Sequence, residues 1–600
     1  MKPVVDILEQ RISEAMARAT KRRGCAALVR PTAETRFGDY QANGVMTLAR
    51  RMKTDPRKLA ELVLERLDVG DICEQPEIAG PGFINLRLKT DFLAASLLEI
   101  NADRENRLGV SRISQPKTFV VDFSGPNIAK QMHVGHLRST ILGDCICRML
   151  EFLGQKVIRQ NHIGDWGLQM GMLLAIVEEF KQSLVAEKNN DAGSRIYVPS
   201  LRKIEEIESL YKAANTRFES NAAFAKKARD FTYQLQNHDI TAVTQWEVLR
   251  KLTLDTCTQI YKTLNVVLSE KDVRGESFYA DRLSDVVLGL VANSLAEESE
   301  GAVCVFPPGF KNKQGQPLPF IIRKSDGAFL YATTDLAALR YRVDELKADA
   351  IVYVTDARQK LHFEMLFAVA RMAGWASEKV ELSHVMFGSV QGPDGRPLKT
   401  REGENVKLKE LLDEALERAR AVIEEKNPGL DEAGKEQIAR AVGIGAVKYA
   451  DFSNNRTSDY VFSFDKMLAM EGNTAPYMQY AYARIKSIER KAESKDVDIE
   501  TELADVGRLN LSDPAEIDLA KYLIRYGGAI EAAAADYRPN YLTSYLYELA
   551  QKFSAFYTNC PVLQAEPDKR PTRLVLCRLT EKTIKHGLSE LLGIDVVEQM

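Results

Sequence analysis

Cysteine is scarce in this chain, since only eight of its 600 residues are cysteine. No pair has C-x-x-C spacing, and none is grouped with histidine as in a zinc finger, so we expect a reducing compartment and no structural zinc. No apolar run approaches the roughly 18 residues that span a bilayer, which predicts no membrane segment. Asp6, Glu9 and Glu14 interrupt the first apolar stretch and argue against a transit peptide, so we expect a cytoplasmic protein.

An excess of charge of one sign is also lacking. The chain has 81 Lys or Arg against 84 Asp or Glu, a net charge of −3, which by itself does not indicate a nucleic-acid partner. The first sixty residues, however, carry thirteen basic against six acidic side chains, and residues 480–491 are again rich in Lys and Arg. The overall balance therefore says nothing against a local basic surface.

The remaining composition is that of a folded protein of several domains, with 45% hydrophobic and 28% charged residues. Apolar residues at helical spacing predict a helix over about 3–22, and an alternating stretch follows at 83–88. We therefore expect residues 1–110 to form a small α+β domain. Beyond about 405 the pattern is almost wholly helical.

The middle of the chain predicts a parallel sheet. Residues 117–123 read as a buried strand, 134–153 as a helix that ends at Gly154, and 156–160 as a second strand, which is the βαβ pattern. A charged helical stretch over 181–270 would interrupt this sheet. We expect the sheet to resume with four further strands, at 303–306, 320–323, 350–354 and 385–388.

Residues 121–138, V-D-F-S-G-P-N-I-A-K-Q-M-H-V-G-H-L-R, lie where a strand ends and a helix begins, the usual place for a ligand in an open α/β sheet. His133 and His136 would share one face of the first helical turn, Gly135 would admit a close ligand, and Lys130 adds a mobile charge. The free N–H groups of a helix N-terminus suit a phosphate. By itself the histidine pair also allows two other interpretations, half of a metal site or a helix cap.

This window resembles the H-I-G-H signature of class I aminoacyl-tRNA synthetases, and its flanks resemble the arginyl-tRNA synthetases. Further matches are N-H-I-G-D-W-G-L-Q at 161–169, L-Y-A-T-T-D-L-A-A at 330–338, V-T-D-A-R-Q-K-L-H-F-E at 354–364, R-F-G-D-Y-Q-A-N at 36–43 and Y-M-Q-Y-A-Y-A-R-I at 477–485. The resemblance covers essentially the whole chain. One departure is the second signature, usually K-M-S-K-S, which here reads G-R-P-L-K-T-R-E-G over 395–403.

The resemblance implies a Rossmann-type parallel-sheet catalytic domain at 111–405 with a helical insertion at 181–270. It also implies an N-terminal α+β domain at 1–110 that binds the tRNA elbow, a connecting helical stem at 406–465, and an all-α anticodon-binding domain at 466–600. The implied activity is ATP-dependent attachment of L-arginine to tRNA(Arg) through arginyl-adenylate, with pyrophosphate and AMP released. Mg²⁺ on the phosphates, no metal held by the protein itself and a monomer are further expectations.

Residue roles are carried over in the same way. His133, His136 and Lys130 would be catalytic, with Lys130 supplying the ammonium that the degenerate second signature lacks. The implied ATP site consists of His133, Gly135, His136, His362, Met386, Phe387, Gly388, Lys399 and Arg401. The implied arginine site consists of Asp122, Ser124, Asn127, Tyr331, Asp335 and Gln359. The implied tRNA contacts are Phe37, Tyr40, Gln41, Asn43, Tyr477, Tyr480 and Met600.

Some alternatives stay open. Asp335 would, without the resemblance, be taken as a helix cap, and Tyr40 and the C-terminal aromatic residues as ordinary core. A synthetase for another amino acid and a non-catalytic RNA-binding paralogue are the competing functions. Asp122 with Asp335 favours a cationic substrate, and the presence of His133, His136 and Lys130 favours an active enzyme. Because the second signature is weak, we also expect amino acid activation to require tRNA.

Overall fold

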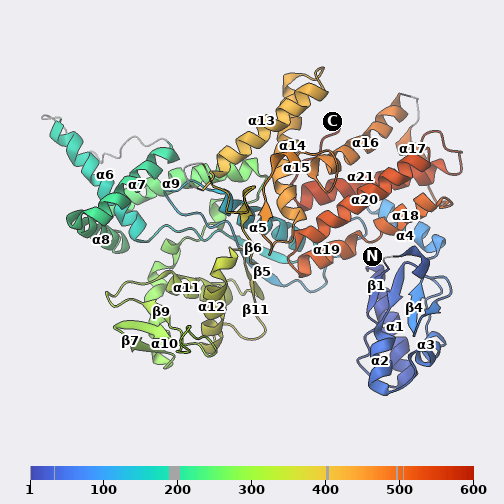
Figure 1. Cartoon of the computed structure of the whole chain (residues 1–600), viewed down its shortest axis with the longest axis horizontal. Helices are drawn as coiled ribbons and strands as arrows, with labels where there is room; N and C mark the ends of the chain where they lie inside the picture. The colour runs from blue at the N-terminus through green and yellow to red at the C-terminus, as the bar shows by residue number, and fades with distance from the viewer. Residues whose placement is uncertain (1, 33, 188–202, 400–404, 495–497, 505) are drawn as a thin grey trace. The chain divides into compact units, whose positions relative to one another are not determined.

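The computed structural model describes residues 2–32, 34–187, 203–399, 405–494, 498–504 and 506–600. The chain divides into two compact units, one of Met1–Ile113 with Ala469–Met600 and the other of Ser114–Leu468. Figure 1 shows the elements of both units, coloured along the chain. None of the helices among the described residues is long and apolar enough to cross a membrane.

A four-stranded parallel sheet forms the centre of the Ser114–Leu468 unit. Its order is β11 (Glu381–His384), β10 (Ala350–Tyr353), β5 (Thr118–Asp122) and β6 (Lys156–Gln160). All four residues of β10 are buried, as a central parallel strand requires. At the carboxyl edge of the sheet, Asp122 lies opposite Tyr353 on one side and Gln160 on the other. The predicted βαβ unit is confirmed.

Helix α5 (Val134–Phe152) joins β5 to β6, at the bounds that the sequence predicted. Gly154 follows the helix with a φ of 92°, a conformation that glycine adopts freely, and this ends the helix. Within α5, a Cβ on Gly143 would lie 2.2 Å from Cγ of Phe123, so only glycine lets the helix approach the end of β5 this closely. Helices α11 (Tyr331–Asp344) and α12 (Lys360–Met372) bury Leu336 and Leu366 in a cluster with Val120 of β5 and Ile351 of β10.

Two of the predicted strands do not belong to the parallel sheet. The segments expected at 303–306 and 320–323 correspond to β8 (Ala302–Val305) and β9 (Phe320–Arg323), which form an antiparallel sheet with β7 (Ala296–Ser299) beside α10 (Leu283–Ala292). A two-residue turn at Glu300 and Gly301, with φ of 51° and 77°, joins β7 to β8. Such a tight hairpin permits only antiparallel pairing. The strand expected at 385–388 is also wrong, since β11 ends at His384.

The helical insertion is confirmed and begins earlier than predicted. It consists of α6 (Leu168–Glu187), α7 (Ile204–Ser220), α8 (Ala222–Gln236) and α9 (Ile240–Thr263). Apolar residues of α6, α7 and α9 share one buried cluster with Ile128 and Ala129, which precede α5. The inserted helices therefore pack directly on the segment ahead of the histidine pair.

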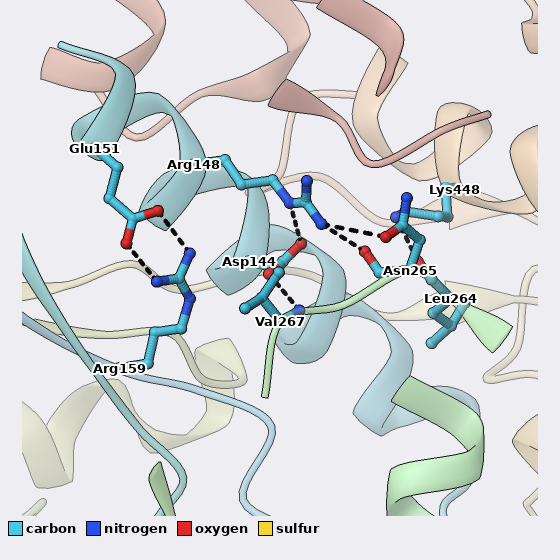
Figure 2. A network of polar contacts seen from close by, with 8 residues as sticks. All are labelled: Asp144, Arg148, Glu151, Arg159, Leu264, Asn265, Val267 and Lys448. Carbon is cyan, nitrogen blue, oxygen red and sulfur yellow. Dashed lines mark hydrogen bonds and ion pairs between the residues drawn. The ribbon is translucent and has the colours of Figure 1, made fainter. Parts of the chain in front are cut away.

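The chain leaving α9 is fixed to the catalytic domain by polar contacts (Figure 2). Asp144 of α5 accepts hydrogen bonds from the Val267 N–H at 2.9 Å and from Nε of Arg148 at 2.7 Å. On the other side, the buried Lys448 donates to the Leu264 carbonyl at 2.6 Å. Buried charged groups satisfied in this way hold the return of the insertion in one place.

The stem after the sheet consists of α13 (Leu408–Lys426), α14 (Glu432–Ser453) and α15 (Phe464–Met467). A short parallel pair, β12 (Val390–Gln391) with β13 (Tyr460–Val461), ties it to the chain beyond β11. Arg138 of α5 forms a fully buried ion pair with Asp451 of α14 at 2.9 Å. The stem is thus built into the catalytic unit.

The first part of the other unit has the predicted α+β character. Its antiparallel sheet has the order β1 (Val29–Pro31), β2 (Tyr40–Ala42), β4 (Phe83–Leu86), β3 (Glu77–Ala79). The helices are α1 (Val4–Thr20), α2 (Gly44–Met52), α3 (Pro56–Leu64) and α4 (Thr90–Ala102). The helix over 3–22 is confirmed: its apolar positions Val4, Leu8, Ile12, Ala15 and Met16 are buried, and Val5 is partly buried.

The second part of this unit is all helical, as expected. It contains α16 (Ala475–Glu493), α17 (Ile499–Ala504), α18 (Pro514–Leu523), α19 (Tyr526–Ala535), α20 (Pro539–Asn559) and α21 (Arg570–Lys585). Tyr482, Tyr526, Phe553 and Phe556 are almost completely buried. For these aromatic residues the alternative interpretation, ordinary core, is correct.

Candidate active site

A cavity of about 630 Å³ opens at the carboxyl edge of the parallel sheet, where an α/β fold is expected to bind its ligand. Asp122 ends β5 and Tyr353 ends β10 at its floor. Helix α5 contributes His133 and His136 to the wall. Helix α11 contributes Asp335 opposite the sheet floor. The cavity therefore combines hydrogen-bond donors at a helix N-terminus with carboxylates.

The two histidines cap α5 through their Nδ1 atoms. Nδ1 of His133 accepts from the Gly135 N–H at 3.0 Å, and Nδ1 of His136 accepts from the His133 N–H at 3.1 Å. A neutral imidazole that accepts at Nδ1 must carry its proton on Nε2. Both side chains are therefore oriented as Nε2–H donors, and the helix-cap alternative describes one part of the same arrangement.

Burial keeps both imidazoles neutral. The pKa of His136 is lowered to about 3, first by burial and then by the neighbouring His133. The pKa of His133 is lowered by burial and then by the positive charges of Lys407 and Lys130. The two groups therefore act as hydrogen-bond donors at neutral pH and not as cations.

Packing inside the protein also requires glycine at position 135, apart from any access for a ligand. A Cβ at this position would lie 2.8 Å from Cε1 of His133 and 2.9 Å from its Nδ1. The glycine therefore makes room for the imidazole that caps the helix, and its own surface is exposed to the cavity.

The basic residues of the two signatures lie apart from the cavity lining. Nζ of Lys130 lies 5.0 Å from the ring centre of Tyr211, on helix α7 of the insertion. Lys399 is exposed, and its backbone forms an isolated antiparallel β-bridge with Asn405. Arg401 lies outside the described residues.

The opposite side of the cavity carries Asp335 and Tyr331 one helical turn apart on α11, as their spacing predicted. The helix-cap alternative for Asp335 is wrong. Helix α11 begins at Tyr331, so Asp335 lies inside the helix and not at its N-terminus. Tyr331 is 63% exposed, so its phenol is free to meet a ligand. Oδ2 of Asp335 lies 2.6 Å from Nε2 of His362.

His362 is surrounded by aromatic rings on the Asp335 side of the cavity. Its ring centre lies 5.0 Å from Tyr331, 5.7 Å from Phe320 and 5.3 Å from Phe363. The resemblance implied that this histidine belongs to the ATP site. In the structure its Nε2 contacts the carboxylate of Asp335, so it stands beside a residue of the implied arginine site.

Glu276 is a cavity residue that the sequence patterns did not reveal. Its N–H donates to the Ile163 carbonyl at 3.1 Å, which brings the segment after the insertion alongside residues 161–164. The carboxylate accepts weakly from the Trp166 N–H at 3.3 Å. Burial is the largest cause that raises the pKa of Glu276. Repulsion from Asp165 and Asp335 raises it further, and the nearby His162 lowers it. The only sequence signal was a lone acidic residue after a helical stretch, which is too common to stand out.

Asp122 and Ser124 line the cavity, yet their side chains already have partners. Oδ2 of Asp122 pairs with the fully buried Arg342 at 2.7 Å, so its charge is largely compensated. The Ser124 hydroxyl lies 2.8 Å from the Tyr261 hydroxyl and accepts from Thr140 at 3.0 Å. These two residues fix the floor and the turn. Among the described residues, Asp335 and Glu276 are the cavity carboxylates without a Lys or Arg partner.

The other predicted arginine-site residues, Asn127 and Gln359, are exposed and line the cavity. Asn127 approaches Gly164 so closely that a Cβ there would lie 2.2 Å from its Oδ1. Gln359 stands directly before α12. Both amides are therefore placed where a ligand can reach them.

The predicted adenine contacts form a fixed turn after β11. Phe387 lines the cavity, while Met386 and Gly388 do not. Arg456 donates to the Met386 carbonyl at 2.7 Å, and Arg138 donates to the Gly388 carbonyl at 2.7 Å. Two guanidinium groups thus hold the backbone of this turn.

The predicted tRNA contacts lie in the other unit. Tyr40 of β2 is only 2% exposed, so the alternative interpretation, that it is a core residue, is correct. The Gln41 side chain donates a hydrogen bond to Oδ1 of Asn85 at 2.8 Å. Phe37 and Asn43 are partly buried.

In the helical part of the same unit, the Tyr477 ring lies 5.5 Å from Tyr547. The Arg484 guanidinium lies 4.7 Å from the Tyr480 ring, which is 37% exposed. Met600 is partly buried. Of the predicted aromatic contacts, Tyr480 presents the most open ring.

Three segments match known protein families. Residues 100–464 match the catalytic domain of the class I tRNA synthetases (R), residues 478–600 the DALR anticodon binding domain, and residues 6–88 the arginyl-tRNA synthetase N-terminal domain. The first match alone covers more than half of the chain. Together the three matches account for both compact units.

Individual proteins are similar along their whole length. The arginine–tRNA ligase of Hahella chejuensis is 46% identical over 99% of both chains, and that of Alcanivorax borkumensis is 48% identical over 95% of this chain and 94% of its own. The crystal structure of the Plasmodium falciparum arginyl-tRNA synthetase covers 100% of both chains with a TM-score of 0.83 at 29% identity. Fold and sequence thus point to one family.

Proposed function

This chain belongs to the class I arginyl-tRNA synthetases, and we propose that it attaches L-arginine to tRNA(Arg) at the expense of ATP. The observation that carries the proposal is one cavity with two neutral Nε2–H donors at the start of α5 and two carboxylates, Asp335 and Glu276, that no Lys or Arg of the described residues neutralises. The donors suit a reacting phosphate, and the carboxylates suit a guanidinium.

In the first step the arginine carboxylate oxygen attacks the α-phosphorus of ATP. The bond to the β-phosphate oxygen breaks, so that arginyl-adenylate and pyrophosphate form. His133 and His136 would donate through Nε2 to the phosphate oxygens as charge shifts toward the leaving group, and Lys130 would add positive charge. No protein nucleophile is needed, so catalysis consists of positioning and electrostatic stabilisation.

In the second step the 3′-terminal adenosine hydroxyl of the tRNA attacks the activated carbonyl. The ester forms, the bond to AMP breaks, and AMP leaves with the electron pair. The hydroxyl proton leaves with the phosphate oxygens or solvent. The neutral histidines would remain hydrogen-bonded to that phosphate throughout.

The guanidinium of arginine would lie against Asp335, Tyr331 and Glu276. A planar cation with five N–H donors matches two carboxylates and a phenol oxygen, whereas a lysine ammonium would leave part of this set unpaired. Asn127, Gln359, Ser124 and Asp122 would shape the site of the amino and carboxylate groups. This arrangement favours arginine over lysine.

Mg²⁺ would enter with ATP. No group of three or more His, Cys, Asp or Glu side chains in the described part of the chain is arranged to hold a metal ion. The donors around the histidine pair are N–H groups and cations, which repel a metal, so the phosphate oxygens of ATP would hold it.

The remaining roles follow the family assignment. We propose that residues 1–110 bind the tRNA elbow, 111–405 catalyse the reaction, 406–465 form the stem, and 466–600 read the anticodon. Phe37, Gln41, Asn43, Tyr477, Tyr480 and Met600 are proposed contacts, and stacking on Tyr480 would contribute about 1–3 kcal/mol. A cytoplasmic monomer completes the proposal.

The decisive test is arginine-dependent ATP–pyrophosphate exchange with and without total tRNA. We expect exchange only when tRNA is present, because the second signature is degenerate and Lys399 does not line the cavity. Robust exchange without tRNA would refute the tRNA requirement. Exchange with lysine but not arginine would favour another synthetase, and tRNA binding without any aminoacylation would favour an RNA-binding paralogue.

A His136→Ala variant sharpens the same test. It should abolish aminoacylation and leave tRNA binding within a few-fold of wild type. Loss of both together would mean that His136 supports the fold and not the reaction.

A further inference from the structure

Each of the four residues 128–131, which lie just ahead of the histidine pair, contacts a helix of the insertion. From α6, Gln169 donates to the Ile128 carbonyl at 2.6 Å. From α9, the Thr253 hydroxyl accepts from the Ala129 N–H at 3.2 Å. Ala129 has a φ of 65°, a left-handed conformation that alanine rarely adopts, so the packing around it must maintain this strain.

Helix α7 holds the next two residues. Nζ of Lys130 lies 5.0 Å from the ring centre of Tyr211, and Nε2 of Gln131 donates to Oε2 of Glu208 at 2.8 Å. Glu208 and Tyr211 are three residues apart, so they share one face of α7. That face is directed at the segment that leads into the active site.

Glu208 also holds a second segment. Its other carboxylate oxygen pairs with Nζ of Lys407, and the two side chains are only 15% and 18% exposed. Lys407 faces His133 as an antiparallel bridge, and the Leu408 N–H donates to the Met132 carbonyl at 2.9 Å. A single carboxylate therefore joins the segment just ahead of His133 to the segment that pairs with His133.

The electrostatics agree with this geometry. After burial, the charges of Lys407 and then Lys130 are the largest causes that lower the pKa of His133. Both ammonium groups are therefore close enough to act on the histidine, while Glu208 and Tyr211 determine where they stay.

We propose that Glu208 is a positioning residue for ATP activation. By holding Gln131 and Lys407 together it fixes the two backbone segments around His133, and Tyr211 keeps Lys130 beside them. The inserted helices thus complete the phosphate side of the active site and are not merely a spacer between strands. This inference rests on the proposed function and deepens it.

The test is pyrophosphate exchange of the full-length enzyme with tRNA present, varying ATP and arginine separately. Glu208→Gln keeps the size of the side chain and removes its charge. We expect kcat/KM for ATP to fall about tenfold, as for loss of a buried charged hydrogen bond, with KM for arginine within twofold. Partial recovery is expected for Glu208→Asp. Glu205→Gln, an exposed position on the same helix, is the matched control and should behave like wild type.

A second pair of variants tests the aromatic contact. Tyr211→Leu should weaken use of ATP as Glu208→Gln does, whereas Tyr211→Phe keeps the ring below Lys130 and should retain activity. Equal loss in both Tyr211 variants would overturn the role of the ring.

Two results would overturn the role of Glu208. One is a Glu208→Gln enzyme that equals Glu205→Gln. The other is a parallel rise in KM for arginine with a lowered Tm, which would mean general loosening of the fold. Absence of arginine-dependent exchange in the wild-type enzyme with tRNA would instead refute the proposed function, and this inference would fall with it.

Discussion

His133 and His136 use one ring nitrogen for the fold and leave the other for chemistry. Their Nδ1 atoms cap α5, so the orientation of each Nε2–H is set before any ligand binds. Preorganised donors of this kind cost no reorganisation during the reaction. The proposed phosphate chemistry therefore depends on the orientation of these two side chains.

The first prediction concerns pH. The pKa of His136 is lowered to about 3, so this imidazole stays neutral as the pH falls from 8 to 6, and burial lowers the pKa of His133 in the same direction. We expect kcat for exchange at saturating substrates to show no inflection near 6.5, the ordinary pKa of histidine. A loss of activity with a midpoint near 6.5 that disappears in His136→Asn would contradict the neutral-donor role.

The lowered pKa of His136 also makes the free energy of unfolding depend on pH. Stability falls as the pH falls, the opposite of what a histidine with a raised pKa would cause. The unfolded chain binds the proton near pH 6.5 while folded His136 does not. The stabilisation is therefore complete above pH 6.5 and is lost progressively as the pH falls toward 3. Melting curves of wild type and His136→Asn over this range should converge at low pH.

A second prediction concerns the guanidinium site. Asp335→Asn should raise KM for arginine about 10- to 100-fold, because a charged hydrogen bond is lost, and should leave KM for ATP within twofold. Asp344→Asn is the control on the same helix, since Asp344 is exposed and pairs only across the surface with Arg340. Steady-state exchange kinetics with each substrate varied will show the split, and a rise in KM for ATP alone would refute the assignment.

A third prediction separates two roles for His362. If it holds Asp335, as the 2.6 Å contact indicates, His362→Gln should raise KM for arginine about five- to tenfold, as for loss of one hydrogen bond to a charged group, with KM for ATP little changed. If it contacts the ribose instead, the pattern should be reversed. Separate titrations of arginine and ATP in the exchange assay distinguish these outcomes.

At the scale of elements, helix α5 contacts several parts of the Ser114–Leu468 unit. Its first turn carries the histidines, Arg138 reaches the stem and the turn after β11, and Asp144 holds the return of the insertion. A shift of this helix would therefore disturb the phosphate site, the adenine turn and the insertion together.

A fourth prediction tests the N-terminus of α5. Gly135→Ala would place a Cβ 2.8 Å from Cε1 of His133, so the imidazole must move and exchange activity should fall by more than tenfold. Gly289→Ala in α10 is the matched control, because its Cβ would meet only Trp375 at an ordinary 3.7 Å. That control should keep full activity and gain up to about 1 kcal/mol of stability. Full activity in Gly135→Ala would show that the cap tolerates displacement.

Sequence patterns predicted the positions of helices and strands better than they predicted which strands pair. The spacing of apolar residues located α1 and α5 because helical periodicity is local, and the βαβ unit followed from the order strand, helix, strand. The strands near 303 and 320 were recognised as strands but assigned to the wrong sheet. Pairing depends on the turn at Glu300 and Gly301 and on packing against α10, which periodicity does not contain.

At the scale of the whole molecule, basic residues are concentrated where RNA contacts are proposed. The first sixty residues hold a large excess of Lys and Arg, although the full chain carries a net charge of −3. A tRNA enzyme needs positive charge only along the RNA, so its salt dependence should be regional.

A fifth prediction follows from this distribution. The double variant Arg50→Gln, Arg51→Gln removes two exposed charges of α2 and should weaken tRNA binding. The slope of log K against log salt should decrease by about one for each lost phosphate contact. Lys379→Gln, an exposed position of the other unit, serves as the control in the same binding titrations. Equal slopes for all variants would place the RNA elsewhere.

The sequence by itself determined the family and the fold class and identified the two histidines as candidate catalytic residues, because these are carried by contiguous motifs in which each residue's neighbours are fixed by the chain. Only the tertiary structure decided which charges are free. It paired Asp122 with Arg342, joined His362 to Asp335, buried Tyr40, brought Glu276 into the cavity lining, and placed Glu208 against Gln131 and Lys407. Each of these depends on contacts between residues far apart in the chain, and compensation of charge or burial of a ring is a property of that packing and not of local spacing.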